Sequence, residues 1–152
     1  MQMQRIGRAA LAGTAGAAAL TTLHEAARKL SPRAPRMDIV GMRGIARLLT
    51  RLEVRIPSNR VLHQLALAGD LVSNAALYAA IGVGRASRAP VRGAVLGALV
   101  GLGALVLPRQ LGLGDPPRSA ESSNRIMTVG WYVVGGLVAG LVHRMLATRP
   151  RR

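Results

Sequence analysis

Apolar residues gather along the chain in four long stretches, which are separated by polar segments that contain prolines. A helix needs about 20 mainly apolar residues to cross a hydrocarbon core about 30 Å thick. The last three stretches meet this length, and the third has no polar side chain between positions 94 and 107. We therefore predict membrane-spanning helices at about residues 9–24, 61–83, 91–111 and 126–146.

The first stretch gives the weakest of these four signals, because it is short and rich in alanine. Arg5 and Arg8 precede it, and the alanines at 17–19 resemble a cleavage site, so a cleaved signal peptide is the alternative. The helical pattern nevertheless continues through His24 and Arg28 without a turn signal. This continuity favours a span that is retained.

The longest polar segment, residues 25–60, contains a helical pattern of another kind. Prolines at 32 and 35 must end a helix there, and Asp38 is a candidate N-cap. Beyond it, arginines at every fourth position form one stripe and apolar residues form the opposite face. The arginines are Arg43, Arg47, Arg51 and Arg55, and the apolar residues are Ile45, Leu48, Leu49, Leu52 and Ile56.

This pattern predicts an amphipathic basic helix over 38–56. Such a helix suits the membrane–water boundary, with its apolar face among the acyl chains and its arginines on anionic lipid headgroups. The alternative is an ordinary helix that packs on a protein partner.

The two halves of the chain resemble each other weakly. Asn59 and Arg60 precede the second span, and Asn124 and Arg125 precede the fourth. A proline-containing turn also follows the first and third spans. The chain is therefore expected to form one membrane domain, residues 1–152, that contains a possible tandem repeat of a two-span unit.

Glycines recur at four-residue intervals in the third and fourth spans. Between helices in lipid there is little hydrophobic drive, so close backbone approach must supply the packing. The spacing predicts tight helix association, within the chain or between copies. The alternative is chance, because the chain contains 18 glycines. The stripes are Gly93, Gly97 and Gly101, and then Gly136 and Gly140.

The second span alone carries a polar stripe, formed by His63, Asp70, Asn74 and Tyr78. An ionisable group in mid-membrane costs at least about 2.5–3.5 kcal/mol and should face protein or water. One hypothesis is a proton- or cation-coupled site with Asp70 as the carrier. The other, which a single carboxylate favours, is an interhelical hydrogen-bond cluster in which Asp70 is protonated or paired with an arginine.

Composition removes several classes of function. The chain has no cysteine, which excludes cysteine-ligated metals and thiol nucleophiles. His24, His63 and His143 lie on different predicted helices, and no catalytic motif is found, so no metal, cofactor or enzymatic activity is expected. The formal charge is +15, but the arginines flank apolar spans. We therefore expect anionic lipids, not nucleic acid, as their partners.

Two features bear on where the protein resides. Lys29 is the one lysine among 21 basic residues, which is typical of a high-GC genome and indicates a bacterial inner membrane. The arginines divide almost evenly between the two sides of a four-span bundle, so the positive-inside rule does not fix its orientation. The predicted amphipathic helix favours a cytoplasmic 25–60 segment.

The sequence thus predicts an all-α integral membrane protein, a helix bundle of about four spans with one interfacial helix. The expected role is non-enzymatic: a small structural or accessory subunit that packs through its glycine-rich helices. Its partners would be its own spans, another copy or a larger membrane complex. A small oligomeric transporter or channel that uses the Asp70 face is the competing class, and an enzyme acting on lipids is a third.

Overall fold

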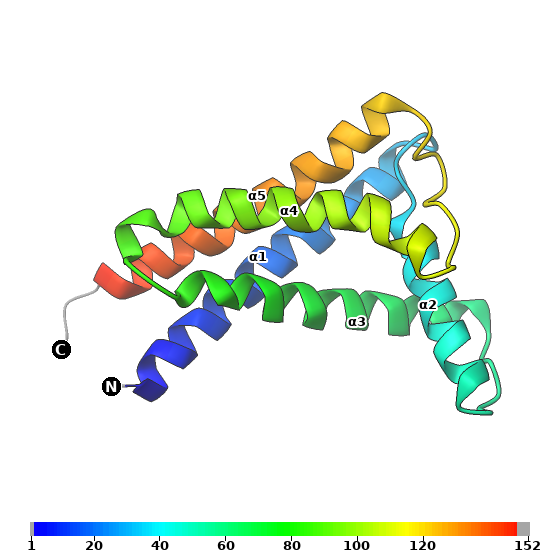
Figure 1. Ribbon diagram of the computed structural model, residues 1–152, viewed down its shortest axis with the longest axis horizontal. Coiled ribbons are helices and arrows are strands. Elements are labelled where there is room, and N and C mark those ends of the chain that lie inside the picture. Colours follow the sequence, from blue (N-terminus) through cyan, green and yellow to red (C-terminus); the bar gives the residue numbers. More distant parts are fainter. Residues whose placement is uncertain (1, 149–152) are drawn as a thin grey trace.

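The computed structural model describes residues 2–148, which form helices joined by short connections, so the all-helical expectation is confirmed. Four long helices run along the long axis of the molecule, and a shorter helix, α2, lies across one end of the bundle (Figure 1). The helices are α1 (Gln2–Leu30), α2 (Met37–Arg51), α3 (Asn59–Ala79), α4 (Ala89–Gln110) and α5 (Ser122–Thr148), with 3₁₀ turns at Ala80–Gly82 and Ala86–Arg88.

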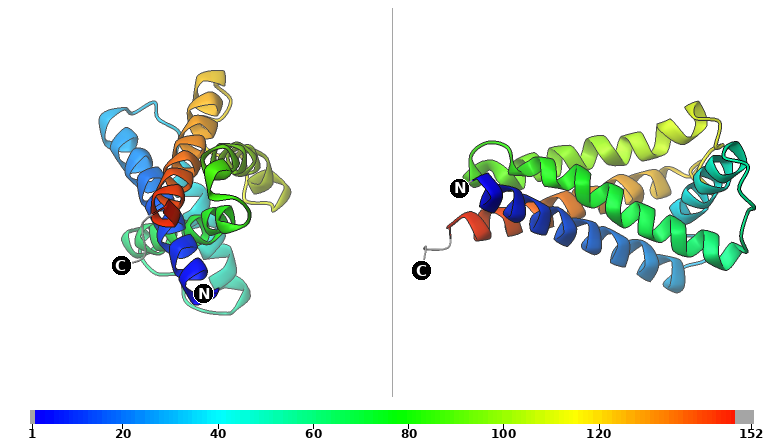
Figure 2. Two further views of the ribbon diagram at one scale, coloured as in Figure 1. Left: turned by 90° about the vertical axis from the view of Figure 1, so that its left-hand side faces the viewer. Right: turned by 90° about the horizontal axis from the view of Figure 1, so that it is seen from below.

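The long helices alternate in direction. The start of α1, the α3–α4 connection and the end of α5 lie at one end of the bundle, and α2 and the α4–α5 connection lie at the other (Figures 1 and 2). Three segments within residues 2–148 are long and apolar enough to cross a membrane. They are Asn59–Gly82, Ala86–Gln110 and Ser122–Thr148. These lengths and compositions suggest an integral membrane protein.

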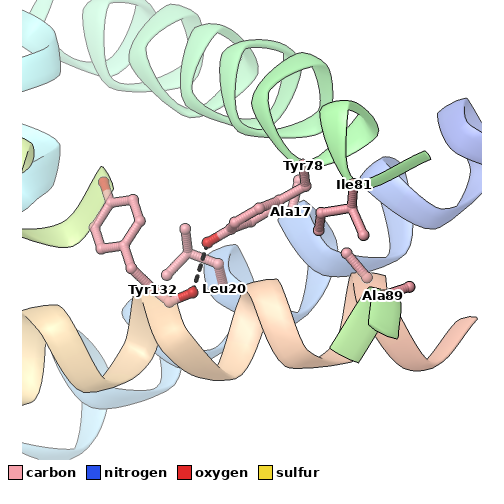
Figure 3. Close-up of a cluster of buried hydrophobic side chains, with 7 residues drawn as sticks. Ala17, Leu20, Tyr78, Ile81, Ala89 and Tyr132 are labelled. Atoms are coloured by element: carbon pink, nitrogen blue, oxygen red, sulfur yellow. Dashed lines mark hydrogen bonds between the residues drawn. The ribbon is translucent and has the colours of Figure 1, made fainter. Parts of the chain in front are cut away.

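The helix α1 is not among these three segments. Length and composition therefore support three of the four predicted spans. Alanine, glycine and threonine take the place of larger apolar residues along α1, and its ends carry charge. Its middle is nevertheless part of the core: Ala17 and Leu20 have no exposed surface. They pack with residues of α3, α4 and α5 in the cluster shown in Figure 3.

The helix α5 is central, since it packs against α4 on one side and α1 on the other, whereas α3 and α4 barely touch. Glycines on α4 make the first of these contacts possible. A Cβ added at Gly93 would strike the carbonyl of Gly136, and one added at Gly101 would lie 2.9 Å from the Cα of Val129. Gly97 faces α5 in the same way.

Glycines on α5 also allow close backbone contact with both of its neighbouring helices, α4 and α1. On the α4 side, a Cβ at Gly140 would lie 2.5 Å from the carbonyl oxygen of Ala89, and Gly136 is equally crowded. On the other side, a Cβ at Gly16 of α1 would lie 2.5 Å from the carbonyl oxygen of Gly135. All five glycines singled out in the sequence therefore lie in the α4–α5 contact, inside the chain.

The helix α2 is shorter than expected, because it ends at Arg51 and not near residue 56. Glu53 adopts a left-handed conformation with φ of 57°. The amide of Val54 donates to the carbonyl of Leu49 at 2.9 Å, and the amide of Glu53 donates to that of Thr50 at 3.2 Å. These two bonds form a Schellman motif, which terminates the helix. Arg55 therefore lies beyond the helix, and its predicted place in the arginine stripe is wrong.

The start of α2 also differs from the expectation. Its N-cap is Arg36, and Asp38 lies in the first turn, so the prediction of Asp38 as the N-cap is wrong. The reason is that the side chain of Asp38 is held by the guanidinium of Arg36 and does not bond to a backbone amide. A carboxylate in the first turn still interacts favourably with the helix dipole.

Replacing Glu53 with glycine is expected to stabilise the protein by about 1 kcal/mol, because glycine adopts the left-handed conformation without the steric cost of a Cβ. Thermal unfolding in detergent measures the effect as a higher Tm. Replacing Glu53 with alanine is the control, since it removes the charge but keeps the Cβ. An equal gain from both variants would assign the effect to charge and contradict the prediction.

The repeat hypothesis predicts equivalent contacts in the two halves. The two successive pairs, α1–α3 and α4–α5, both pack closely. The cross pairs are unequal, however, because α1 packs along α5 while α3 and α4 barely touch. The tandem repeat therefore stays a prediction from sequence.

Candidate functional site

The four polar residues of the predicted stripe on α3 take part in three separate interactions. His63, near the start of α3, faces α1 and α2. One turn of helix connects Asp70 and Asn74, and the Asn74 amide donates to Asp70 Oδ1 at 2.8 Å. Tyr78 is fully buried, and its hydroxyl donates to the carbonyl of Tyr132 on α5 at 2.8 Å (Figure 3).

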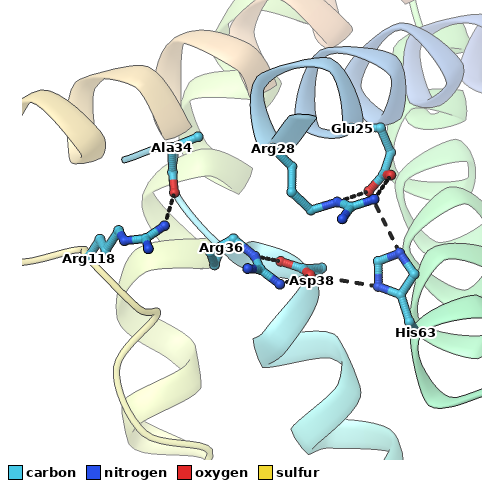
Figure 4. A network of polar contacts seen from close by, with 7 residues as sticks. All are labelled: Glu25, Arg28, Ala34, Arg36, Asp38, His63 and Arg118. Carbon is cyan, nitrogen blue, oxygen red and sulfur yellow. Dashed lines mark hydrogen bonds and ion pairs between the residues drawn. The ribbon is translucent and has the colours of Figure 1, made fainter. Parts of the chain in front are cut away.

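His63 belongs to a charged corner where α1, α2 and α3 meet (Figure 4). Its Nε2 lies 3.9 Å from Glu25 Oε1, and its Nδ1 lies 3.7 Å from Asp38 Oδ2. Arg28 holds Glu25 with bonds of 3.1 and 2.6 Å. Arg36 likewise makes a bidentate pair with Asp38, with bonds of 2.8 and 2.7 Å.

The charged corner lowers the pKa of Asp38. Partial burial by itself raises this pKa, but the hydrogen bonds from Arg36 and the positive charge of that guanidinium outweigh it. The net pKa of Asp38 therefore lies below its ordinary value of 3.8. The charged form of this carboxylate thus stabilises the fold.

We expect the protein to lose this contribution in acid. Since the pKa of Asp38 is lower in the folded state than in the unfolded one, its contribution is complete above about pH 4 and disappears as the pH falls through the folded-state pKa. Thermal unfolding of the wild type and of Asp38→Asn between pH 7 and pH 3 tests this. The wild type should be more stable at neutral pH, and the two curves should converge in acid. A constant difference would contradict the prediction.

Asp70 faces a cavity of about 570 Å³ between α3 and α4. In Figures 1 and 2 these helices are joined at one end of the bundle and diverge toward the end where α2 lies. The first turn of α2 closes the wide end of this wedge, and α1 and α5 form its floor. Within residues 2–148, the side chain that bonds to Asp70 is Asn74 of its own helix, not an arginine.

The arginines of α2 divide into two groups. Arg47 donates to the carbonyls of Leu111 and Gly112 at 2.9 and 2.8 Å. Arg43 donates to those of Leu113 and Asp115, both at 3.2 Å. Both therefore bond to the carbonyl groups that follow α4, where a positive charge is favourable.

Arg51 and Arg55 complete the set of predicted headgroup ligands. Both are exposed, Arg51 at the end of α2 and Arg55 in the segment that follows it. Arg43 and Arg47 are exposed as well, so contact of all four arginines with anionic lipid stays a prediction.

Arg36 and Gly135 take part in the contacts described above, although the sequence patterns did not single them out. Arg36 stands two residues before the acidic Asp38, in a segment whose prolines predict only the end of a helix. Gly135 lies outside the four-residue spacing, although it follows the rule that small residues mark helix contacts. Within residues 2–148 there is no group of three or more His, Asp or Glu that could hold a metal ion.

The fold and these interactions define the class of protein: an all-helical chain with three helices apolar enough to cross a membrane. No protein-family model, curated protein or solved structure matches the chain.

Proposed function

We propose that this chain is a non-enzymatic structural or accessory subunit of a bacterial inner membrane, with four spans and an interfacial helix. One observation carries the proposal: α5 is in backbone contact with both α1 and α4 through glycines. Such contacts make one rigid body of these three helices, because backbone atoms cannot move aside as side chains can.

The fourth span in this proposal is α1. Between Arg8 and Glu25 it has no charged side chain, apart from any charge on His24. It runs beside α3 and α5, and its buried middle lies in the same core as theirs. Polar residues at both ends would lie at the two membrane surfaces.

Cysteine labelling tests the number of spans, because the chain has no native cysteine. Single variants Gln4→Cys, Ser31→Cys, Ser87→Cys and Ser119→Cys are exposed to a membrane-impermeant thiol reagent. With four spans, positions 31 and 119 react from one side and positions 4 and 87 from the other. If position 4 reacts from the same side as position 31, α1 does not span the membrane.

The close packing of the bundle near the α3–α4 connection supports a structural role over transport. Asp70 faces a cavity near the α2 end, whereas the half toward the α3–α4 connection is packed with Tyr78, Ile81, Ala89 and Ala139. A transport path past Asp70 would have to separate these residues.

Purification from the source membrane in a mild detergent tests the role. An accessory subunit should retain the same membrane partner at a fixed stoichiometry, and an unrelated tagged membrane protein of similar size is the control. A pure homo-oligomer that conducts protons or cations in vesicles, and loses this flux in Asp70→Asn, would support transport and overturn the proposal.

A further inference from the structure

The cavity between α3 and α4 has the size and walls of a ligand site. Its volume of about 570 Å³ falls within the range of about 300–1,000 Å³ that is typical of small-molecule pockets. Most of its lining is apolar, and it includes Leu67, Leu77, Leu99 and Leu107. Leu99 and Leu107 are 62% and 52% exposed, so the cavity opens sideways between the helices. In the proposed four-span arrangement, on which this inference rests, that opening faces lipid.

The ionisable residues of the lining are mostly acidic, with His24 beside them, although the whole chain has a formal charge of +15. Three of the six acidic residues, Glu25, Asp38 and Asp70, line the cavity, and its described lining contains no arginine or lysine. Glu25 and Asp38 are paired with arginines just outside the cavity. Asp70 differs, because the side chain that holds it within residues 2–148 is the neutral amide of Asn74.

Asp70 also lies deep along α3. It is eleven residues beyond Asn59, the first residue of the helix, which places it about 16 Å along the axis. An ionised carboxylate at this depth in a membrane is costly unless a positive group accompanies it. No arginine or lysine of the described lining supplies that group, and His24, the histidine of that lining, is not paired with Asp70. A bound ligand would therefore supply it.

We propose that the cavity binds a single-chain amphiphile whose head is a protonated primary amine. The ammonium group bonds to the carboxylate of Asp70. The apolar chain lies along the leucines of α3 and α4. Because the cavity opens between these helices, the ligand enters sideways from the bilayer.

Binding of tritiated dodecylamine to the full chain in phosphatidylcholine nanodiscs at pH 7 tests this proposal, with empty nanodiscs as the background. We expect saturable binding to the wild type. In Asp70→Asn the Kd should rise at least about tenfold, the effect of losing one charge-assisted hydrogen bond. The matched control, Asp115→Asn, removes an acidic residue that does not line this cavity and should bind like the wild type.

A second pair of variants tests whether the ligand binds in the cavity, by filling the cavity with a side chain. A Cβ at Gly103, which lines the cavity, would lie 3.4 Å from Leu107 Cδ1, an ordinary contact, so Gly103→Leu should place its side chain in the cavity and abolish binding. Gly69→Leu on α3 is the control, since a Cβ there meets nothing within 4 Å. This variant should bind normally.

Competition with unlabelled dodecanol and dodecanoate, which share the chain length, tests the charge of the head. Neither should displace dodecylamine as well as unlabelled dodecylamine does. Equal displacement by dodecanol, or an unchanged Kd in Asp70→Asn, would overturn the ammonium site. Absence of saturable binding to the wild type would overturn the whole inference. Cysteine labelling tests the number of spans separately from ligand binding. An error in the proposed spans is therefore distinguishable from the absence of a ligand site.

Discussion

Replacing Gly136 with alanine is expected to destabilise the protein by about 3 kcal/mol. The new Cβ would strike the carbonyl of Gly93 and lie 3.3 Å from the amide nitrogen of Gly97. Overpacking usually costs about 1–3 kcal/mol, and the upper part of this range applies because backbone atoms of α4 cannot rotate away. Unfolding by SDS titration in mixed micelles measures the loss.

Gly130→Ala is the matched control on the same helix. A Cβ at Gly130 meets nothing within 4 Å, so this substitution should be neutral or should stabilise α5 by roughly 0.5–1 kcal/mol through helix propensity. The two alanine variants should therefore shift stability in opposite directions. Similar effects of both would mean that α4 and α5 do not touch through Gly136.

Replacing Leu20 with alanine is expected to cost about 2 kcal/mol, the second largest effect. Leu20 has no exposed surface and packs in the core cluster with Tyr78 and Tyr132 (Figure 3). Truncation leaves a cavity that the rigid glycine-packed helices cannot close. The cost is below that in a water-soluble core, because leucine gains little from leaving lipid for protein.

Leu11→Ala on the same helix is the control, since Leu11 is 63% exposed. Its replacement should change the unfolding free energy by less than about 0.5 kcal/mol. The comparison also tests whether α1 belongs to the bundle in the membrane. Equal small losses from both variants would place α1 outside the core.

Helix identity was predictable from the sequence because apolar length is a direct consequence of membrane thickness. The stretches at 61–83, 91–111 and 126–146 correspond to α3, α4 and α5. The partner of each glycine stripe was not predictable. Small residues at four-residue spacing permit close approach to any helix, so the pattern of Gly93 and Gly97 did not distinguish contact with α5 from contact with another copy.

The end of α2 was not predictable from periodicity, because the arginine and leucine spacing continues beyond it. What stops the helix is the left-handed Glu53, a conformation more usual for glycine. The hydrogen-bond partners of Arg43 and Arg47 were not predictable from the sequence either. A stripe of arginines matches lipid phosphates and helix-terminal carbonyls equally well, and only the position of the α4 end distinguishes them.

The candidate site was foreseen in part. The spacing of His63, Asp70, Asn74 and Tyr78 placed them on one face of α3. It could not show that three different environments lie along that face: a charged corner, a cavity and a packed core. The cavity itself depends on the divergence of α3 and α4, which is a tertiary feature with no local signal.

The central position of α5 has a consequence for biogenesis. As the chain emerges from the ribosome, α1 and α3 can form their hairpin early, but α4 has few contacts with α3 and depends on α5 for its packing. Until α5 is inserted, α4 would stay loosely attached in the bilayer. Assembly is therefore completed by the last of the long helices, and a chain that ends before residue 122 would leave the glycine face of α4 unpacked.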